Sequence, residues 1–420
     1  MKRVVITGLG AITAAGEGSS ALWEAVKSGC SAIDAIHFQD SGQGWDAIGA
    51  RIANFEAEKY VTQRKSLKVM ARDIQLAVAG ASLAMEDSKL KKDGYDCDRF
   101  GVIMGSGVLN HELDELAYSV ANSLGDDKQL DIKKFGDAGL SSLFPLWLLK
   151  YLPNMPACHI SILFDLRGMN NTITVGASGG LQAIGEALRI IQRGDADLML
   201  AGGAESKLNP VGLSQYKILG ALCGDTAGDP KKIYKPFHQN SKGFVVGEGA
   251  AFLVLEELGH AQKRGAKIYA EVLGFGASYR DGHSIAMNSA LKDAKISSDQ
   301  IHYLQASGIG IQREDQREME AIREVFGQHS KNLQVSASKP IIGFTGFSAG
   351  ALDLVISTMA LGEQRVPPTL NYEKTIQETG FKISSQVMVS QSMECAMTNA
   401  FGFNGQTASI ITRVFGESKK

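Results

Sequence analysis

Cysteine and proline are scarce in this sequence, and neither sign of charge is in clear excess. Its five cysteines are widely spaced and form no C-x-x-C pair, which argues against a zinc site and predicts reduced thiols in the cytoplasm. A formal net charge of -2 gives no reason to expect nucleic acid or an anionic membrane as a partner. No segment approaches the ~20 consecutive apolar residues of a membrane span.

Glycine, by contrast, is abundant, with 47 residues against nine prolines in a chain of 420. This balance favours many tight turns between strands and helices over disorder. Near-continuous apolar runs at 197–201 and 250–255 predict strands that are buried on both faces. Predicted strands alternate with predicted helices along the whole chain, which indicates a layered α/β architecture of two halves.

The first glycine motif, Gly8-Leu9-Gly10, follows a predicted strand at residues 4–7. It resembles the start of a dinucleotide-binding turn, but Thr13 stands where the third glycine would be, and no acidic residue clearly ends a following strand. A tight turn between elements is therefore the favoured interpretation, and no nicotinamide cofactor is predicted.

Residues 172–180 predict a strand, a turn of small residues and then a helix. A thiol in this turn would be activated by the helix N-terminus, but Ala177 places a methyl group there. The same segment also fits G-x-S-x-G, so a hydrolase or acyltransferase that uses Ser178 stays open as an alternative. Such an enzyme needs a later acid and histidine, and none of the later histidines lies clearly in a small-residue loop after a strand. Ser178 would otherwise cap the helix.

Four segments of the chain resemble the β-ketoacyl synthases of the thiolase superfamily. They are residues 1–13, 176–205, 242–258 and 399–409, and they occur in the family's order. The resemblance implies a thiolase fold, in which two similar halves (residues 1–258 and 259–420) form a layered αβαβα body that dimerises. Active members condense acyl and malonyl groups that an acyl carrier protein delivers.

The resemblance also assigns the positions of the family's catalytic cysteine and two histidines. They fall on Ala177, Ser307 and Phe344, none of which can form a thioester or act as an imidazole does. The threonines that contact the phosphopantetheine arm in the family are replaced by Ile309 and Ile311. These positions therefore predict a vestigial site without catalytic residues or a metal.

Other family residues remain in place. Lys339 and Glu318 match a pair that supports the site in active relatives, and here they are predicted to form a structural ion pair. Phe401 and Phe403 match the phenylalanines of a gating loop, in which Asn404 replaces a glycine.

Within the family, the chain most resembles the chain length factor, or ketosynthase β subunit, of type II polyketide synthases. This implies a non-catalytic subunit that heterodimerises with a catalytic ketosynthase α and shapes the tunnel that sets polyketide chain length. No cofactor would bind directly, because phosphopantetheine arrives on the acyl carrier protein. Many such subunits carry glutamine at the position of Ala177, so its absence argues against decarboxylative priming. A purely structural ketosynthase partner is a further alternative.

The resemblance places the tunnel gate on a helix predicted at residues 109–124, after Gly105-Ser106-Gly107. Apolar residues recur there at helical spacing, which is also typical of ordinary core packing. The residues predicted to line the gate and the subunit interface are Leu109, His111, Glu112, Leu113 and Leu116.

Overall fold

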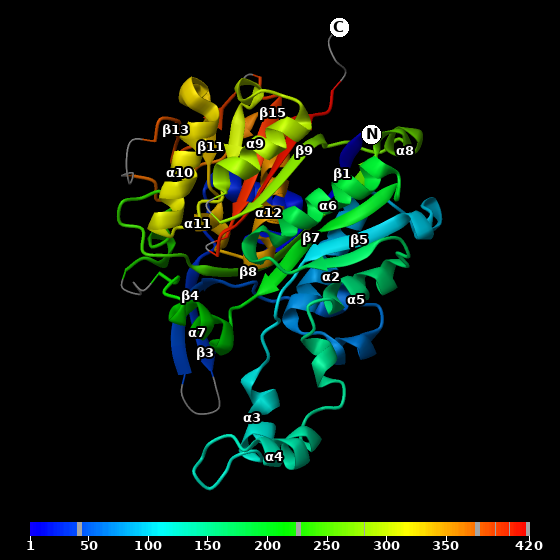
Figure 1. The fold of residues 1–420 in the computed structure, drawn as a ribbon, viewed down its shortest axis with the longest axis vertical. Coiled ribbons are helices and arrows are strands. Elements are labelled where there is room, and N and C mark those ends of the chain that lie inside the picture. Colours follow the sequence, from blue (N-terminus) through cyan, green and yellow to red (C-terminus); the bar gives the residue numbers. More distant parts are fainter. Residues whose placement is uncertain are drawn as a thin grey trace.

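The computed structural model of the chain describes residues 1–39, 44–223, 228–280, 282–373, 379–390, 392–402 and 404–416. Strands from both halves of the sequence lie side by side, with helices on either side and between them (Figure 1). The predicted division into two halves at residue 258 stays a prediction. The two parts share one sheet, in which β1 of the first half pairs directly with β9 of the second.

One large sheet runs through the molecule, and β1 pairs antiparallel with both β8 and β9 at its centre. Hydrogen-bonded strands follow the order β13 (Lys382–Ile383), β11 (Gln334–Ser336), β10 (Tyr303–Gln305), β15 (Cys395–Phe401), β16 (Gln406–Val414), β9 (Ala270–Tyr279), β1 (Val4–Thr13), β8 (Val246–Glu257), β7 (Leu198–Ser206), β5 (Phe100–Gly105) and β6 (Asn170–Ile173). Shorter strands lie off this path, namely β2 (Gly16–Glu17), β3 (Asp34–Gln39) and β4 (Gly44–Ala50), and β12 (Arg365–Val366) pairs with β14 (Met388–Val389).

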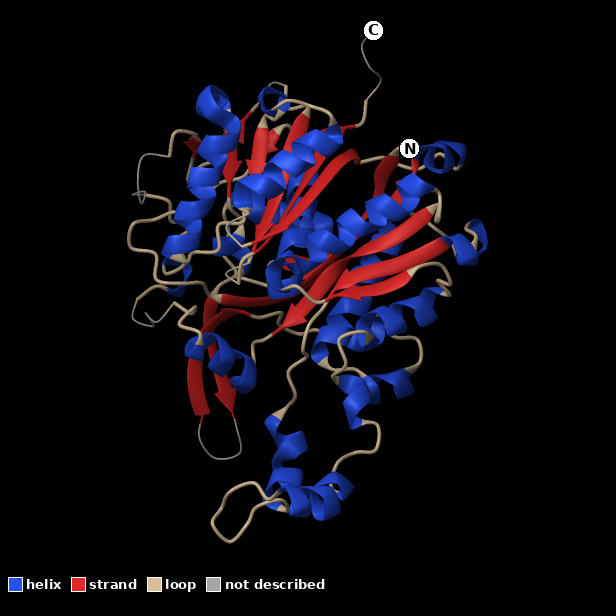
Figure 2. Cartoon of the chain, viewed as in Figure 1, coloured by secondary structure: helices blue, strands red, loops and turns tan. Residues whose placement is uncertain are grey.

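Two helices form the inner layer between the halves of this sheet. Helices α6 (Gly179–Arg193) and α12 (Ala349–Glu363) contact each other and strands of both halves, and α12 is buried almost throughout. Helices α2 (Arg72–Asp87) and α5 (Met155–Phe164) cover the outer face of the first half. Helices α9 (His283–Ala294) and α10 (Gln312–Phe326) cover that of the second (Figure 2). The remaining helices are α1 (Ser19–Ser28), α3 (Leu113–Ala121), α4 (Ile132–Lys134), α7 (Pro210–Ile218), α8 (Leu258–Lys263) and α11 (Lys339–Ile342).

The turn predicted at Gly8-Leu9-Gly10 is wrong, because these residues belong to β1, which has a bulge between Ile6 and Gly8. Glycine is needed here for close packing instead. A Cβ atom on Gly10 would lie 2.1 Å from the carbonyl oxygen of Gly80 in α2. The motif therefore lets a helix approach the sheet, and it forms no turn that a dinucleotide phosphate could occupy.

The helix predicted at 109–124 is also wrong in its bounds, because α3 begins at Leu113. Glu112 is extended, and Asp114 and Glu115 lie in the first turn, where acidic side chains favour a helix start. Leu109 is buried in the core, whereas Leu113 is 46% exposed, so the predicted residues do not share one helical face. Helices α3 and α4 extend away from the body, and we refer to residues 107–151 as the arm (Figure 1).

Within the described residues, we find no helix that combines the length and the apolar character needed to cross a membrane.

We predict that Gly10→Ala destabilises the protein by about 1–3 kcal/mol, because the new methyl group meets the backbone of α2 and the contact cannot relax cheaply. Urea denaturation measures the change. Gly94→Ala is the matched control, since its added Cβ would meet nothing within 4 Å. Equal unfolding midpoints for the two variants would contradict this account of β1.

Candidate active site

The turn that precedes α6 has the backbone geometry of a nucleophile site without the nucleophile. Gly176 has a φ of +66°, a left-handed conformation that suits glycine, and residues Gly176–Ser178 form a short 3-10 turn. Ala177 is buried, and its methyl group belongs to an apolar cluster that also contains Ile309, Phe244 and Phe344. The predicted strand–turn–helix is therefore present, and its turn presents a methyl group to an apolar space.

Among the described residues, we find no partner of Ser178 that could take its proton. Its hydroxyl is fully buried, lies 3.3 Å from the carbonyl oxygen of Val175, and accepts a hydrogen bond from Gln182 at 3.0 Å. A serine nucleophile requires a base within hydrogen-bond reach, and neither neighbour is one. Ser178 does not cap α6 through its side chain either.

Ser307 joins the end of β10 to the end of β15. Its hydroxyl donates to the carbonyl oxygen of Phe401 at 3.2 Å and accepts from the backbone N–H of the same residue at 3.0 Å. Because both capacities of the hydroxyl are used within the backbone, Ser307 acts here as a structural bridge.

Phe344, at the position predicted for the second histidine, makes aromatic contacts. Its ring is 2% exposed, and its centroid lies 4.3 Å from that of Phe244 and 6.3 Å from that of Tyr216. The backbone of Phe344 also donates to Val245, at 2.7 Å. Ala177 and Phe344 therefore share one apolar cluster, which also includes Ile309, two residues after Ser307.

The predicted ion pair between Lys339 and Glu318 is replaced by a different one. Lys339 Nζ lies 2.7 Å from Asp353 Oδ2, and both residues are almost fully buried. Glu318 instead accepts hydrogen bonds from the backbone N–H groups of Ser307 and Gly308, each at 2.8 Å. Sequence reasoning missed Asp353, although a lone charged residue inside the mostly apolar segment 349–361 was a signal of a buried partner.

Burial also changes the acidity of the carboxyl groups that support this region. It raises the pKa of Asp315 to about 7, against the opposing effect of hydrogen bonds from the backbone of Phe237 and Gly310. It raises the pKa of Glu318 as well, and the nearby charge of Lys339 counteracts this only in part. These groups hold the loop at residues 307–310, whose Gly308 and Gly310 have positive φ angles.

The remaining predicted residues are dispersed. Phe401 is buried and packs edge-on against His283, with ring centroids 4.3 Å apart, whereas Phe403 lies outside the described residues. On the arm, His111 lies near Trp147 and Tyr151, Glu112 is exposed, and Leu116 is half-buried. A gate or interface role for these residues stays a prediction.

Comparison with known proteins identifies the family. The N-terminal domain of β-ketoacyl synthases matches residues 1–261, and the C-terminal domain matches residues 269–373. The chain belongs to the β-ketoacyl synthase family. It is 34% identical to 3-oxoacyl-[acyl-carrier-protein] synthase 2 of Vibrio cholerae over 98% of both chains, and 33% identical to that of Coxiella burnetii over 99% of both.

Similar solved structures span the whole chain. The ishigamide ketosynthase/chain length factor has a TM-score of 0.84 at 26% identity, and a β-ketoacyl synthase of Burkholderia phymatum has 0.83 at 28%, each over 99% of this chain and 100% of the other. Another similar structure, a type II polyketide ketosynthase in complex with its acyl-carrier protein, has 0.81 at 26% over the same shares. These matches confirm the predicted family and the thiolase-type α/β fold.

The predicted function is corrected by the same comparison. A non-catalytic chain length factor is contradicted, because the relatives that match this β-ketoacyl synthase along its full length are named as 3-oxoacyl-acyl-carrier-protein synthases, which are enzymes. The side chains of Ala177, Ser307 and Phe344 cannot form a thioester or act as an imidazole does, and this is all that they exclude.

We predict that Lys339→Met lowers the free energy of unfolding by about 3–5 kcal/mol, because it leaves the Asp353 carboxylate buried without its counter-ion. The double variant Lys339→Met/Asp353→Leu should recover most of this loss. Chemical denaturation measures both.

The control for this prediction is Arg193→Met, which breaks the exposed pair with Asp195 and should cost less than ~1 kcal/mol. A double variant no more stable than Lys339→Met would show that the buried charge is not what costs stability.

Proposed function

We propose that this protein is an enzyme of 3-oxoacyl chain synthesis that acts on thioesters carried by an acyl carrier protein. The observation that carries the proposal is the full-length similarity to 3-oxoacyl-acyl-carrier-protein synthases. The backbone turn at the start of α6, where Ala177 lies, supports it.

The step that suits these side chains is decarboxylation of a malonyl thioester. The bond between the α-carbon and the carboxylate breaks, CO₂ leaves, and the electron pair moves toward the thioester oxygen before the carbon takes a proton from water. This reaction needs stabilisation of an oxyanion but no acyl-enzyme, so the methyl group of Ala177 does not prevent it.

Two features of the site favour this step. The N-terminus of α6, a helix of 15 residues, directs partial positive charge toward the turn at Ala177. The apolar surroundings, which include Ile309 and Phe344, disfavour a bound carboxylate and so favour loss of its charge as CO₂. In the sequence, the missing glutamine at position 177 argues against decarboxylation. In this proposal the oxyanion is stabilised by backbone N–H groups of the turn, which do not depend on the side chain at that position.

A basic pocket beside the site supports binding of the carrier. Lys232, Lys235 and Lys242 line a cavity of about 520 Å³ that also includes Gln312, the residue after Ile311. Asp229 also lines it, 3.9 Å from Lys232 Nζ, so cations outnumber the one carboxylate among its described lining residues. Ammonium groups suit the phosphate of a phosphopantetheine arm, which the carrier itself would bring. In this proposal the protein binds no cofactor of its own.

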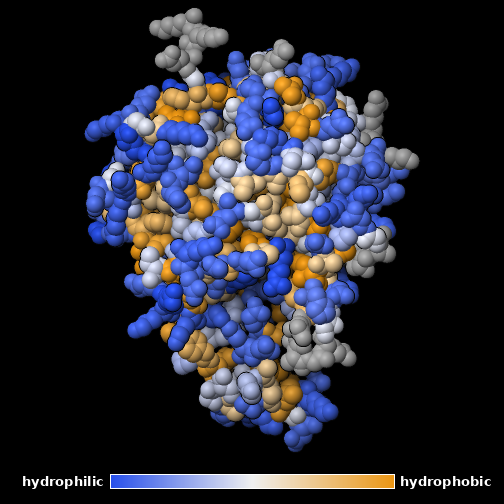
Figure 3. Space-filling model, turned by 180° about the vertical axis from the view of Figure 1, so that it is seen from behind, coloured by the Kyte–Doolittle hydropathy of each residue, from blue (hydrophilic) through white to orange (hydrophobic). Residues whose placement is uncertain are grey.

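Formation of a carbon–carbon bond through an acyl-enzyme would require a cysteine from another chain. We propose that a ketosynthase bearing that cysteine pairs with this protein in the cytoplasm, where its five free cysteines stay reduced. Strand β6 lies at the edge of the sheet, with Asn170 and Asn171 exposed. Hydrophobic side chains also reach the surface of the arm, at the bottom of Figure 3. They include Val108, Leu113, Tyr118, Val120, Leu124, Leu130, Ile132, Leu140, Phe144, Leu146 and Leu148.

We predict that the purified chain converts malonyl-acyl carrier protein to acetyl-acyl carrier protein without becoming acylated, because decarboxylation needs no nucleophile at residue 177. Mass spectrometry of both proteins measures this. Ala177→Trp should abolish turnover by filling the site, and Ala53→Trp, at an exposed position, should not. Absence of acetyl product, or a malonyl adduct on the chain, would refute the proposed step.

We predict that Lys232→Glu and Lys235→Glu each weaken binding of the acyl carrier protein about three- to tenfold at low salt, because each reverses a charge at the basic pocket. Surface plasmon resonance at two salt concentrations measures the effect. Lys263→Glu, on the distant helix α8, serves as the control. Equal losses for all three variants would indicate a general charge effect and would contradict docking at this pocket.

A further inference from the structure

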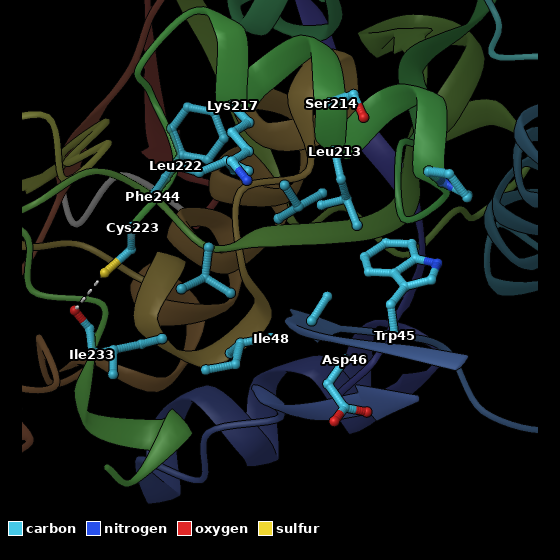
Figure 4. A pocket seen from close by; sticks show the side chains of 14 residues that line it. Trp45, Asp46, Ile48, Leu213, Ser214, Lys217, Leu222, Cys223, Ile233 and Phe244 are labelled. Carbon is cyan, nitrogen blue, oxygen red and sulfur yellow. Dashed lines mark hydrogen bonds between the residues drawn. The ribbon is translucent and has the colours of Figure 1, made fainter. Parts of the chain in front are cut away.

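A second cavity, separate from the Ala177 site, opens between the β3–β4 hairpin and α7. Its volume is about 440 Å³, within the ~300–1,000 Å³ that is typical of small-molecule sites. Figure 4 shows Trp45 and Ile48 of β4 facing Leu213 of α7 across it. Phe244 and Leu222 close the inner end.

The walls of this cavity are held in place before any ligand arrives. The ring of Trp45 stacks on that of Phe38, with centroids 4.4 Å apart and planes inclined by 11°. Leu213 is 8% exposed, and Phe244 is fully buried. A preformed apolar wall lowers the ordering cost of binding, so an apolar group can enter without rearrangement of the core.

The charge that reaches this cavity is positive. Asp46 and Lys217 are the charged residues among its described lining. The Asp46 carboxylate points away from the cavity in Figure 4, and it lies 2.8 Å from Nδ1 of His37. Lys217 comes down from α7 beside Leu222 and Phe244, and we find no ion pair for it among the described residues. The cavity therefore combines an apolar interior with one cation.

This cavity is distinct from the region of Ala177. Phe244 lines it on one side and packs against Phe344 on the other, with ring centroids 4.3 Å apart. Neither Phe344 nor Ala177 belongs to its lining. A ligand bound here would lie behind the aromatic pair, so the inference does not depend on the proposed function.

From these observations we infer that the cavity binds a small amphipathic carboxylate, a free fatty acid of medium chain length. The unbranched tail would lie between Trp45 and Leu213, and the carboxylate would face Lys217. Because Lys217 is exposed to solvent, its ion pair should change affinity only modestly, and burial of the tail should supply most of the binding.

Calorimetric titration of the full chain with three ligands that share one tail tests the inference. Decanoate, decanol and decylammonium carry a negative, a neutral and a positive head group, and each is used below its micelle concentration. We expect decanoate to bind about fivefold more tightly than decanol, and decylammonium to bind more weakly still. Decanoate binding no tighter than decylammonium would overturn the inference.

Variants then locate the ligand. Lys217→Met should remove the preference for decanoate over decanol, whereas Lys263→Met on α8 should preserve it. Leu213→Trp should abolish binding of all three ligands by filling the cavity, whereas Leu219→Trp, at a position 60% exposed, should not.

Ala47→Phe fills the same cavity from β4. Circular dichroism reports whether each variant folds, and Ala47→Phe keeps the test decisive if Leu213→Trp does not. Binding that survives both filling variants would overturn the inference. Ala177→Trp should leave decanoate binding unchanged. Loss of decanoate binding in Ala177→Trp would place the ligand at the proposed malonyl site. That result would refute a second site, whatever the outcome of the decarboxylation assay.

Discussion

The buried ion pair between Lys339 and Asp353 organises the centre of this protein. Asp353 lies on α12, and its carboxylate also accepts hydrogen bonds from Ser338 at 2.7 Å and Gln305 at 2.9 Å. One side chain of the inner helix thus binds α11, the segment before it, and the end of β10. A buried charge is tolerated only when its partners satisfy it in this way, so the positions of these elements depend on one another.

The region around Ala177 follows from that arrangement. Strand β10 leads toward Ile309, α11 leads to Phe344, and the turn before α6 places Ala177 in the same apolar cluster. The fold of the β-ketoacyl synthase family is therefore retained, while the positions predicted for its thiol and two imidazoles carry a methyl group, a hydroxyl bound to backbone and an aromatic ring. The proposed decarboxylation relies on the backbone of this turn, because the methyl group of Ala177 cannot form a thioester.

Local sequence patterns predicted some elements well and others poorly. The predicted strand, turn and helix around residues 172–180 are present, although the strand covers Asn170–Ile173, because small residues and an apolar periodicity specify that unit locally. Gly8 and Gly10 were misinterpreted, since a glycine needed for a turn and a glycine needed for close helix packing look alike in sequence. The start of α3 was misplaced because apolar spacing continues through residues 109–112, where Leu109 belongs to the core instead.

The sequence by itself determined the family, the α/β class and the absence of cysteine and histidine at positions 177, 307 and 344, because these properties reside in the identity of single residues and short motifs. Only the tertiary structure decided that Lys339 pairs with Asp353, that Glu318 binds the backbone at 307–308, and that Phe244 lies between the cavity at α7 and the ring of Phe344. These contacts join residues that are far apart along the chain or carried by different elements. The packing of α12 between the sheet halves, and of the aromatic cluster that contains Phe244 and Phe344, selects among partners that a sequence pattern leaves equivalent.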